Sequence, residues 1–289
     1  MTIQTVGVIG CGLMGHGIAQ VSAVAGHRVV VCEEEQEALD RGMGRIRKSL
    51  DKLVEKEKVS AEDAQAALGR IQGTVQFDDL ADCDLVVEAI IEDLEIKKTL
   101  FAKLGETCKP ETIFASNTSS FSVGDMGKAS GRPERMVGLH FFNPVQLMKL
   151  VEVVKTAETS DEVFASAKAF GEATGKVPVA ANDTPGFVVN RLLVPYMADA
   201  MRMVDRGDAT PADIDAGMTL GCGYPMGPFK LTDYVGLDTT LSILEGWHAA
   251  DPENVLFEPP AILKQLVAEG KLGRKTGEGF YKWDGDKVA

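Results

Sequence analysis

A glycine-rich turn between an apolar strand and an apolar helix constrains this chain most. Residues 5–9 form a short apolar strand pattern, and residues 10–15 (Gly-Cys-Gly-Leu-Met-Gly) lead from it directly into a helical pattern. Gly10 permits a tight turn, Gly12 lets a pyrophosphate approach the backbone, and Gly15 lets the helix pack closely on the strand. The N–H groups at the start of the helix can receive phosphates. The turn therefore predicts a dinucleotide-binding unit.

An acidic residue follows the next predicted strand. Residues 27–32 form that strand, and Glu33 at its end has about the separation from the turn at which an acid binds the adenosine ribose. Glu33, Glu34 and Glu35 together would repel a ribose phosphate, and the nearest cation, Arg28, lies at the far end of the strand. We therefore expect NAD rather than NADP, with Glu34 and Glu35 as solvated acids of a helix start.

Polar residues also follow two further predicted strands. Glu92 and Lys97 come after a buried parallel-type strand at residues 84–91, and residues 116–120 (Ser-Asn-Thr-Ser-Ser) follow a strand at residues 112–115. Ligands of open parallel sheets bind beyond the carboxyl ends of the strands. The hydroxyl cluster either hydrogen-bonds a substrate oxygen or forms a helix cap or turn, because Ser, Thr and Asn favour both structures.

Residues 135–155 contain two runs rich in β-branched and aromatic residues around a proline, which predicts a β-hairpin. With the hairpin centred on Gln146, His140 lies opposite Glu152, and their Cβ atoms are about 4.5–5.5 Å apart. Glu152 stands in an apolar run, where a buried carboxylate is costly without a partner. The pair is either a general base with its orienting acid, or a core histidine and an edge-strand glutamate facing water.

A locally basic helix is predicted at residues 40–58. Its cations, spaced so that they share one face, are Arg45, Lys48, Lys52 and Lys56. In an acidic protein this face, with the Ser49 hydroxyl, could hold the phosphates of a coenzyme A-type substrate. The interleaved Asp51, Glu55 and Glu57 equally suit an ordinary salt-bridged helix.

The pattern changes after a last predicted strand at residues 177–181. Residues 182–186 (Asn-Asp-Thr-Pro-Gly) break it, and helices and loops are expected beyond them, beginning with a helix at residues 187–204. The sequence thus predicts an α/β chain, with a Rossmann-type, mostly parallel sheet domain at residues 1–184 and a smaller all-α domain at residues 185–289. The helical domain is expected to bury its apolar residues in a homodimer.

Composition narrows the expected partners. The formal net charge of −13 argues against binding to nucleic acid or to anionic membranes, because either surface would repel the chain. The five cysteines are scattered without a Cys-x-x-Cys spacing, so neither a disulfide framework nor a metal site is predicted. Without a basic leader or an apolar run of about 18 residues, a cytoplasmic location is expected.

Several longer motifs occur in a characteristic order. They are Gly10-Cys11-Gly12-Leu13-Met14-Gly15 with Gly17-Ile18-Ala19-Gln20, Val87-Glu88-Ala89-Ile90, Ala115-Ser116-Asn117-Thr118-Ser119-Ser120, His140-Phe141-Phe142-Asn143-Pro144, Pro185-Gly186-Phe187-Val188-Val189-Asn190-Arg191, Gly223-Tyr224-Pro225-Met226-Gly227-Pro228 and Gly273-Arg274-Lys275-Thr276-Gly277. Over nearly its entire length the chain resembles the 3-hydroxyacyl-CoA dehydrogenase family, particularly its short bacterial members, the 3-hydroxybutyryl-CoA dehydrogenases. One departure is Glu33, which stands where many members have an aspartate and has a longer reach.

The resemblance implies roles for individual residues. His140 and Glu152 match the catalytic histidine and glutamate, and Ser119 and Asn190 match an active-site serine and asparagine. The residues implied around the cofactor are Gly10, Gly12, Leu13, Met14, Gly15, Glu33, Glu92, Lys97, Ser119, Asn143 and Lys275. Those expected around the coenzyme A substrate are Ser49, Lys52, Lys56, Ser119 and Asn190.

The implied activity is reversible hydride transfer between NAD and a short-chain (S)-3-hydroxyacyl-CoA, such as 3-hydroxybutyryl-CoA, which gives the 3-ketoacyl-CoA. Two alternatives stay open. A gulonate-type dehydrogenase of free hydroxy acids would share the nucleotide fold without needing the basic helix. A non-catalytic NAD-binding protein would keep the fold without chemistry.

Overall fold

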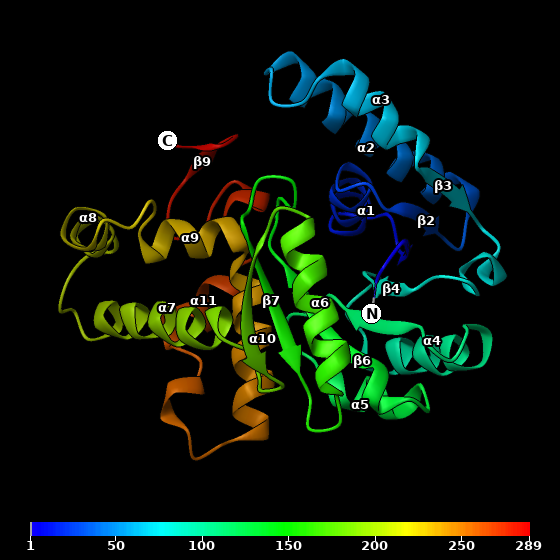
Figure 1. The fold of residues 1–289 in the computed structure, drawn as a ribbon. Coiled ribbons are helices and arrows are strands. Elements are labelled where there is room, and N and C mark those ends of the chain that lie inside the picture. The colour runs from blue at the N-terminus through cyan, green and yellow to red at the C-terminus, as the bar shows by residue number, and fades with distance from the viewer. Residues whose placement is uncertain (1) are drawn as a thin grey trace. The chain divides into compact units, whose positions relative to one another are not determined.

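The computed structural model describes residues 2–289, which form two compact units, one up to Phe187 and one from Val188 onward. The first unit is built around one eight-stranded sheet with the order β3-β2-β1-β4-β5-β6-β7-β8 (Figure 1). Its strands are β1 (Thr5–Ile9), β2 (Arg28–Cys32), β3 (Ile71–Thr74), β4 (Leu85–Glu88), β5 (Ile113–Ser116), β6 (Met136–Phe141), β7 (Leu150–Lys155) and β8 (Val177–Asn182). All neighbouring strands are parallel except β6 and β7. The predicted Rossmann-type, mostly parallel sheet is confirmed.

Helices cover both faces of this sheet. They are α1 (Gly15–Val24), α2 (Gln36–Glu55), α3 (Ala61–Gly69), α4 (Leu94–Thr107), α5 (Val123–Ala129) and α6 (Asp161–Ala173), with short 3-10 turns at η1 (Phe77–Leu80) and η2 (Pro133–Arg135). Successive strand residues alternate between two apolar clusters: Val29 and Val31 pack with α1, α2, α3 and α6, whereas Val30 packs with α4 and α5. Because both faces are buried, the strands read as continuous apolar runs.

The second unit is mainly helical. It contains α7 (Val189–Asp205), α8 (Pro211–Cys222), α9 (Pro228–Val235), α10 (Leu237–Ala250), η3 (Val255–Phe257), α11 (Ala261–Ala268), η4 (Arg274–Thr276), β9 (Trp283–Asp284) and β10 (Lys287–Val288). Its own core includes Met201, Phe229 and Leu244, all fully buried. The predicted helical character is confirmed, and a small antiparallel pair, β9 and β10, follows the helices.

Two helix boundaries also differ from the sequence analysis. The basic helix α2 begins at Gln36 and ends at Glu55, so Lys56 is its C-cap residue and Lys58 lies beyond it. The first helix of the second unit begins at Val189 rather than at residue 187, because Phe187 has a positive φ of 51° that a helix does not accommodate.

Within residues 2–289, none of the helices has the length and apolar character needed to cross a membrane. In the same described part of the chain, no three His, Cys, Asp or Glu side chains gather as a metal site would require. The five cysteines are free thiols, and all except Cys222 are buried.

Candidate active site

The antiparallel strands β6 and β7 bring an imidazole and a carboxylate together. His140 lies directly opposite Glu152, which confirms the predicted hairpin register. His140 Nδ1 and Glu152 Oε2 are 2.6 Å apart, and the two residues are 6% and 0% exposed. Glu152 therefore lies in the sheet interior with the imidazole as partner, not at a solvated edge as the alternative reading required.

Aromatic rings surround the imidazole. The Phe142 and Phe187 ring centroids lie 4.6 Å and 5.6 Å from that of His140, both tilted against it. These apolar neighbours limit the positions that the imidazole can take, while the hydrogen bond to Glu152 fixes its Nδ1 side. A general base needs this kind of fixed geometry relative to the proton it removes.

Buried polar contacts hold the β6–β7 connection. Lys176, which is 8% exposed, donates from Nζ to the backbone oxygens of Val145 and Met148. Burial lowers the pKa of the Lys176 ammonium, and the neighbouring Lys149 charge acts in the same direction. Gln146 donates through its side-chain amide to Gln20 on α1 at 3.2 Å. The connection that carries Asn143 is thus fixed to the body of the unit, and Asn143 itself is exposed.

The glycine turn has the geometry that a dinucleotide requires. Gly10 has a positive φ of 87°, and a Cβ atom there would lie 2.6 Å from the backbone oxygen of Ala89 beyond β4. A Cβ atom at Gly15 would lie 1.7 Å from the backbone oxygen of Gly10, so only glycine allows α1 to start so close to β1. At Gly12, in contrast, a Cβ would meet nothing within 4 Å. The turn is therefore open where a pyrophosphate would approach the start of α1.

Glu33 stands beside this turn. Its Oε1 atom accepts a hydrogen bond from the backbone N–H of Cys11 at 2.5 Å, and the residue is half-buried. The acid at the end of β2 therefore lies directly beside the glycine turn, and its predicted contact with the ribose stays a prediction. Burial, with a contribution from the Glu33 charge, raises the pKa of the neighbouring Cys11 thiol to about 12.

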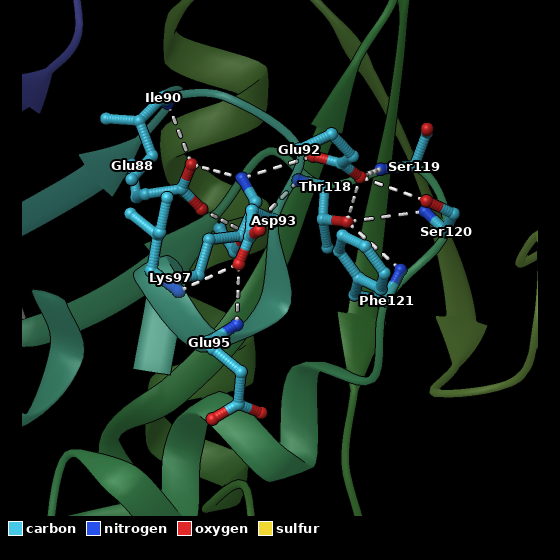
Figure 2. A network of polar contacts seen from close by, with 12 residues as sticks. Glu88, Ile90, Glu92, Asp93, Glu95, Lys97, Thr118, Ser119, Ser120 and Phe121 are labelled. Atoms are coloured by element: carbon cyan, nitrogen blue, oxygen red, sulfur yellow. Dashed lines mark hydrogen bonds and ion pairs between the residues drawn. The ribbon is translucent and has the colours of Figure 1, made fainter. Parts of the chain in front are cut away.

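A half-exposed carboxylate organises the hydroxyl cluster that follows β5. Glu92 Oε1 accepts hydrogen bonds from the Thr118 hydroxyl, from Ser120 Oγ at 3.0 Å and from the Ser119 backbone N–H at 3.2 Å (Figure 2). Burial alone would raise the pKa of the Glu92 carboxyl, but the Lys97 charge and the hydrogen bonds that this carboxyl accepts outweigh burial and lower it. The Ser119 hydroxyl points away from Glu92 in Figure 2.

Lys97 lies in the interior of the first unit, and its predicted contact with the cofactor stays a prediction. It is 1% exposed, and its Nζ atom forms ion pairs with the fully buried Glu88 and, at 3.2 Å, with Glu92 Oε2. The sequence analysis noted an acid embedded in the strand at residues 84–91, but it did not identify Glu88 as the partner of Lys97.

A cavity of about 190 Å³ lies against the basic face of α2. Its lining residues are Ser49, Lys52, Leu53, Lys56, Lys58, Pro144, Gln146 and Leu147. Three of the predicted coenzyme A residues thus share one cavity. Lys58 was missed, since the positive φ of Glu57 (54°) turns the chain back after the helix and brings Lys58 to the cavity. Arg45 and Lys48 do not line it, although they were expected on the same face.

Two predicted site residues belong to the second unit. Asn190 is half-buried near the start of α7. Lys275 lies in η4 and donates from Nζ to Asp238 Oδ2 at 2.5 Å. Their predicted contacts with substrate and cofactor stay predictions.

The open glycine turn, its neighbouring acid and the buried imidazole–carboxylate pair on one sheet define a dinucleotide-dependent dehydrogenase. Comparison with known proteins makes this class specific. Residues 5–184 match the family described as 3-hydroxyacyl-CoA dehydrogenase, NAD binding domain, and residues 186–283 match its C-terminal domain. The chain belongs to the 3-hydroxyacyl-CoA dehydrogenase family, an NAD-dependent oxidoreductase family, and the predicted cofactor is confirmed.

Similar proteins support this membership over nearly the whole chain. A rat protein named "Hydroxyacyl-coenzyme A dehydrogenase, mitochondrial" is 50% identical over 97% of this chain and 91% of its own length. A Deinococcus radiodurans protein named "Probable 3-hydroxybutyryl-CoA dehydrogenase" is 50% identical over 96% of this chain and 99% of its own. The crystal structure of (S)-3-hydroxybutyryl-CoA dehydrogenase from Ralstonia eutropha superposes with a TM-score of 0.95, at 40% identity, and covers 98% of this chain and 100% of that one.

Proposed function

We propose that this chain catalyses the reversible oxidation of short-chain (S)-3-hydroxyacyl-CoA to 3-ketoacyl-CoA with NAD, and that 3-hydroxybutyryl-CoA and acetoacetyl-CoA are its substrates. The observation that carries the proposal is the buried His140–Glu152 pair, with 2.6 Å between Nδ1 and Oε2. The names of the similar proteins from Deinococcus radiodurans and Ralstonia eutropha support the substrate.

The proposed chemistry centres on His140. When bound, NAD would supply the hydride acceptor for the 3-carbon of the substrate. His140 Nε2 removes the proton of the 3-hydroxyl group, so that this oxygen becomes the ketone oxygen as the C–H bond breaks. Glu152 holds Nδ1 protonated and stabilises the imidazolium by its charge, without itself taking the proton. In the reverse direction the protonated His140 returns the proton to the oxygen.

Ser119 is assigned to the substrate oxygen. Its hydroxyl points away from the Glu92 network (Figure 2), while its backbone N–H is held by that network. A hydroxyl donor aimed at the oxygen stabilises the negative charge that develops there as its proton leaves. The resemblance gives Asn190 the same role.

The cavity on α2 is assigned to the coenzyme A phosphates. Lys52, Lys56 and Lys58 supply three ammonium groups to one cavity, and Ser49 adds a hydroxyl donor. In a chain with a formal net charge of −13, such a local cluster attracts an anionic ligand that the rest of the surface repels. A dehydrogenase of free hydroxy acids would not need it.

The test is the loss of NADH absorbance with acetoacetyl-CoA, acetoacetate and free sugar acids as substrates. Turnover is expected with the thioester, and faster turnover of a free acid would contradict the proposal. The His140→Gln variant is expected to bind NADH normally and to lose turnover by several orders of magnitude. His248→Gln, which changes a histidine outside the proposed site, is the matched control and should keep turnover. Near-normal turnover in His140→Gln would refute the role of His140.

We also propose a homodimer formed through the second unit, and a cytoplasmic location. Exposed apolar side chains on α7 and α8 support the dimer, among them Leu192 at 70% and Leu220 at 87% exposure. The free state of all five cysteines supports a reducing compartment. Sedimentation equilibrium of the purified chain, compared with Leu220→Glu, tests the dimer; a wild-type monomer would contradict it.

A further inference from the structure

A lysine and a glutamate are buried together behind the hydroxyl cluster. Lys97 on α4 is 1% exposed and Glu88 at the end of β4 is 0% exposed, and the two form an ion pair. Glu92 also contacts the Lys97 ammonium, so two carboxylates share one cation. In Figure 2, Glu88 and Lys97 lie on one side of Glu92, and Ser119, Ser120 and Phe121 lie on the other. The proposed chemistry uses neither Lys97 nor Glu88.

Glu88 connects three elements of the first unit. Its Oε1 atom accepts from the Ile90 backbone N–H at 2.8 Å and from Lys97 Nζ on α4. Its Oε2 atom accepts from Ser116 Oγ at the end of β5 at 2.6 Å. The buried carboxylate thus fixes the end of its own strand, a neighbouring helix and the end of the adjacent strand.

Two chains of contacts run from this ion pair to the loop that carries Ser119. In one, Ser116 Oγ, held by Glu88, accepts from the Thr118 backbone N–H at 3.1 Å. In the other, Lys97 holds Glu92 Oε2, and Glu92 Oε1 accepts from the Ser119 N–H. Both therefore end on the backbone immediately next to the Ser119 side chain.

The same loop is attached to the strand that carries His140. Asn117 Oδ1 accepts a hydrogen bond from the backbone N–H of Phe141 at 2.9 Å. Within the loop, the Thr118 hydroxyl oxygen accepts from the N–H groups of Ser120 and Phe121 at 3.3 Å and 3.1 Å. The loop is thus fixed to β6 on one side and to the buried ion pair on the other.

A buried ion pair is a poor way to stabilise a fold, because removing two charges from water costs as much as their attraction returns. Apolar residues of similar volume often serve stability as well or better. A fully hydrogen-bonded polar network does fix its members in one arrangement. Here that arrangement extends to the backbone of Ser119, and this argues that the pair serves position rather than stability.

We propose that Glu88 and Lys97 are positioning residues: the buried pair holds Glu92 and the 117–121 loop so that the Ser119 hydroxyl has one fixed place relative to His140. The kinetic part of this inference rests on the proposed function of Ser119. The structural part, the fixing of the loop, does not depend on any activity.

The structural part is tested by hydrogen–deuterium exchange on the full chain. In Lys97→Met, the peptide covering residues 116–122 is expected to exchange about tenfold faster than in the wild type, because Glu92 loses its cation and releases the Ser119 N–H. Lys98→Met is the matched control, since Lys98 is a partly exposed neighbour whose ion pair with Glu95 lies within its own helix. Exchange of this peptide that is unchanged in Lys97→Met would overturn the proposal.

A second variant covers the case in which Lys97→Met does not fold. Glu88→Gln/Lys97→Met removes both charges of the pair, so that no unpaired buried charge is left, while Glu92 still lacks Lys97. The same faster exchange of residues 116–122 is expected. Wild-type exchange in this double variant would count against the proposal as firmly as it would in the single variant.

The kinetic part is tested by acetoacetyl-CoA reduction. In whichever of Lys97→Met and Glu88→Gln/Lys97→Met folds, kcat is expected to fall by about 10- to 100-fold, which is the effect of losing one well-placed donor. Adding Ser119→Ala to this variant should cost less than about threefold more, although it should cost about 10- to 100-fold in the wild type. A tenfold rise in the KM for NADH with unchanged kcat would instead make Lys97 a direct cofactor ligand.

The two proposals fail separately. If the wild-type chain does not reduce acetoacetyl-CoA at all, the proposed function is wrong, and hydrogen exchange still decides whether the ion pair fixes the loop. If the wild type turns over and the effects of Lys97→Met and Ser119→Ala multiply independently, the proposed function stands and the positioning role of the pair is wrong.

Discussion

The two compact units both bury carboxylates, but they satisfy them in different ways. In the first unit, Glu88 is paired with Lys97 and Glu152 with His140, so each acid has an ionisable partner. In the second unit, Asp215 accepts from the Phe229 and Lys230 backbone N–H groups and from the Tyr281 hydroxyl. Asp233 accepts from the N–H groups of Phe280 and Tyr281 and from Trp283 Nε1.

The acids of the first unit fix loops and residues of the candidate site, whereas those of the second unit fix the segment at residues 280–283. The donors around Asp215 and Asp233 do not change charge near neutral pH, and they tie residues 280–283 to α8 and α9. They resemble helix caps in their effect, and Asp215 indeed meets the first N–H groups of α9. Lys97 and His140, the partners of Glu88 and Glu152, are basic side chains, and they lie next to the polar loops of the candidate site. The following predictions test this contrast.

The largest effect is expected for the acid whose partner is a base. Glu152→Gln should reduce kcat for acetoacetyl-CoA by about 10³- to 10⁴-fold, because an amide neither stabilises an imidazolium nor enforces the tautomer. The KM for NADH should stay close to that of the wild type. Steady-state kinetics measure both quantities, and Glu158→Gln, an exposed glutamate just after β7, is the control. A loss below tenfold would place Glu152 among the merely structural acids.

A large effect on stability is expected where a buried charge loses its partner. Lys97→Met should lower the free energy of unfolding by about 3–5 kcal/mol, since Glu88 is then left charged and uncompensated. Glu88→Gln/Lys97→Met, which removes both charges, should recover at least half of that loss. Lys98→Met should change the free energy of unfolding by less than about 0.5 kcal/mol. Urea unfolding measures all three, and a double variant less stable than Lys97→Met would contradict the account.

The sequence predicted local parts of the site better than long-range parts. The register of His140 and Glu152 followed from one short hairpin, in which the side-chain alternation leaves few choices. The Glu88–Lys97 pair did not follow, because nothing in the sequence shows that the first turn of α4 faces inward at Lys97 while Lys98 stays partly exposed. The Ser116 contact with Glu88 depends on the pairing of β4 with β5, which only the folded sheet determines.

Weakly patterned elements were missed for a different reason. The strand β3 contains Gln72 and Gly73 and is only partly buried, so it lacks the apolar run that marked β1 and β2. The fold class was still predictable, since the glycine turn and the apolar strands require helices on both faces of a parallel sheet. The extent of the basic cavity was not predictable, because Lys58 reaches the cavity through the turn at Glu57 rather than through a helix face.

A smaller effect on stability is expected for an acid held by neutral donors. Asp233→Asn should lower the free energy of unfolding by about 1–3 kcal/mol, because an amide group replaces one acceptor that meets N–H donors. Limited proteolysis should cut the chain near residues 280–283 sooner, because this segment loses its attachment. Asp284→Asn, at an exposed position of β9, is the control. If Asp233→Asn matched the loss in Lys97→Met, the contrast between charged and neutral partners would not hold.

The smallest effect is expected for the pH dependence of stability. It should have opposite signs for a carboxylate of the first unit and one of the second. Burial raises the pKa of the Glu92 carboxyl, but the Lys97 charge and the hydrogen bonds outweigh it and lower this pKa. The contribution of Glu92 to stability is therefore present above the ordinary pKa near 4.5. It is lost as the pH falls through the lowered value. Burial raises the pKa of Asp233 above 3.8, so its contribution is present below 3.8 and is lost as the pH rises through the raised value. Urea midpoints are measured from about pH 3 to 7. As the pH rises, the midpoint of the wild type should increase relative to that of Glu92→Gln. Over the same range it should decrease relative to that of Asp233→Asn. Two differences that change in the same direction would show that the two carboxylates are compensated alike.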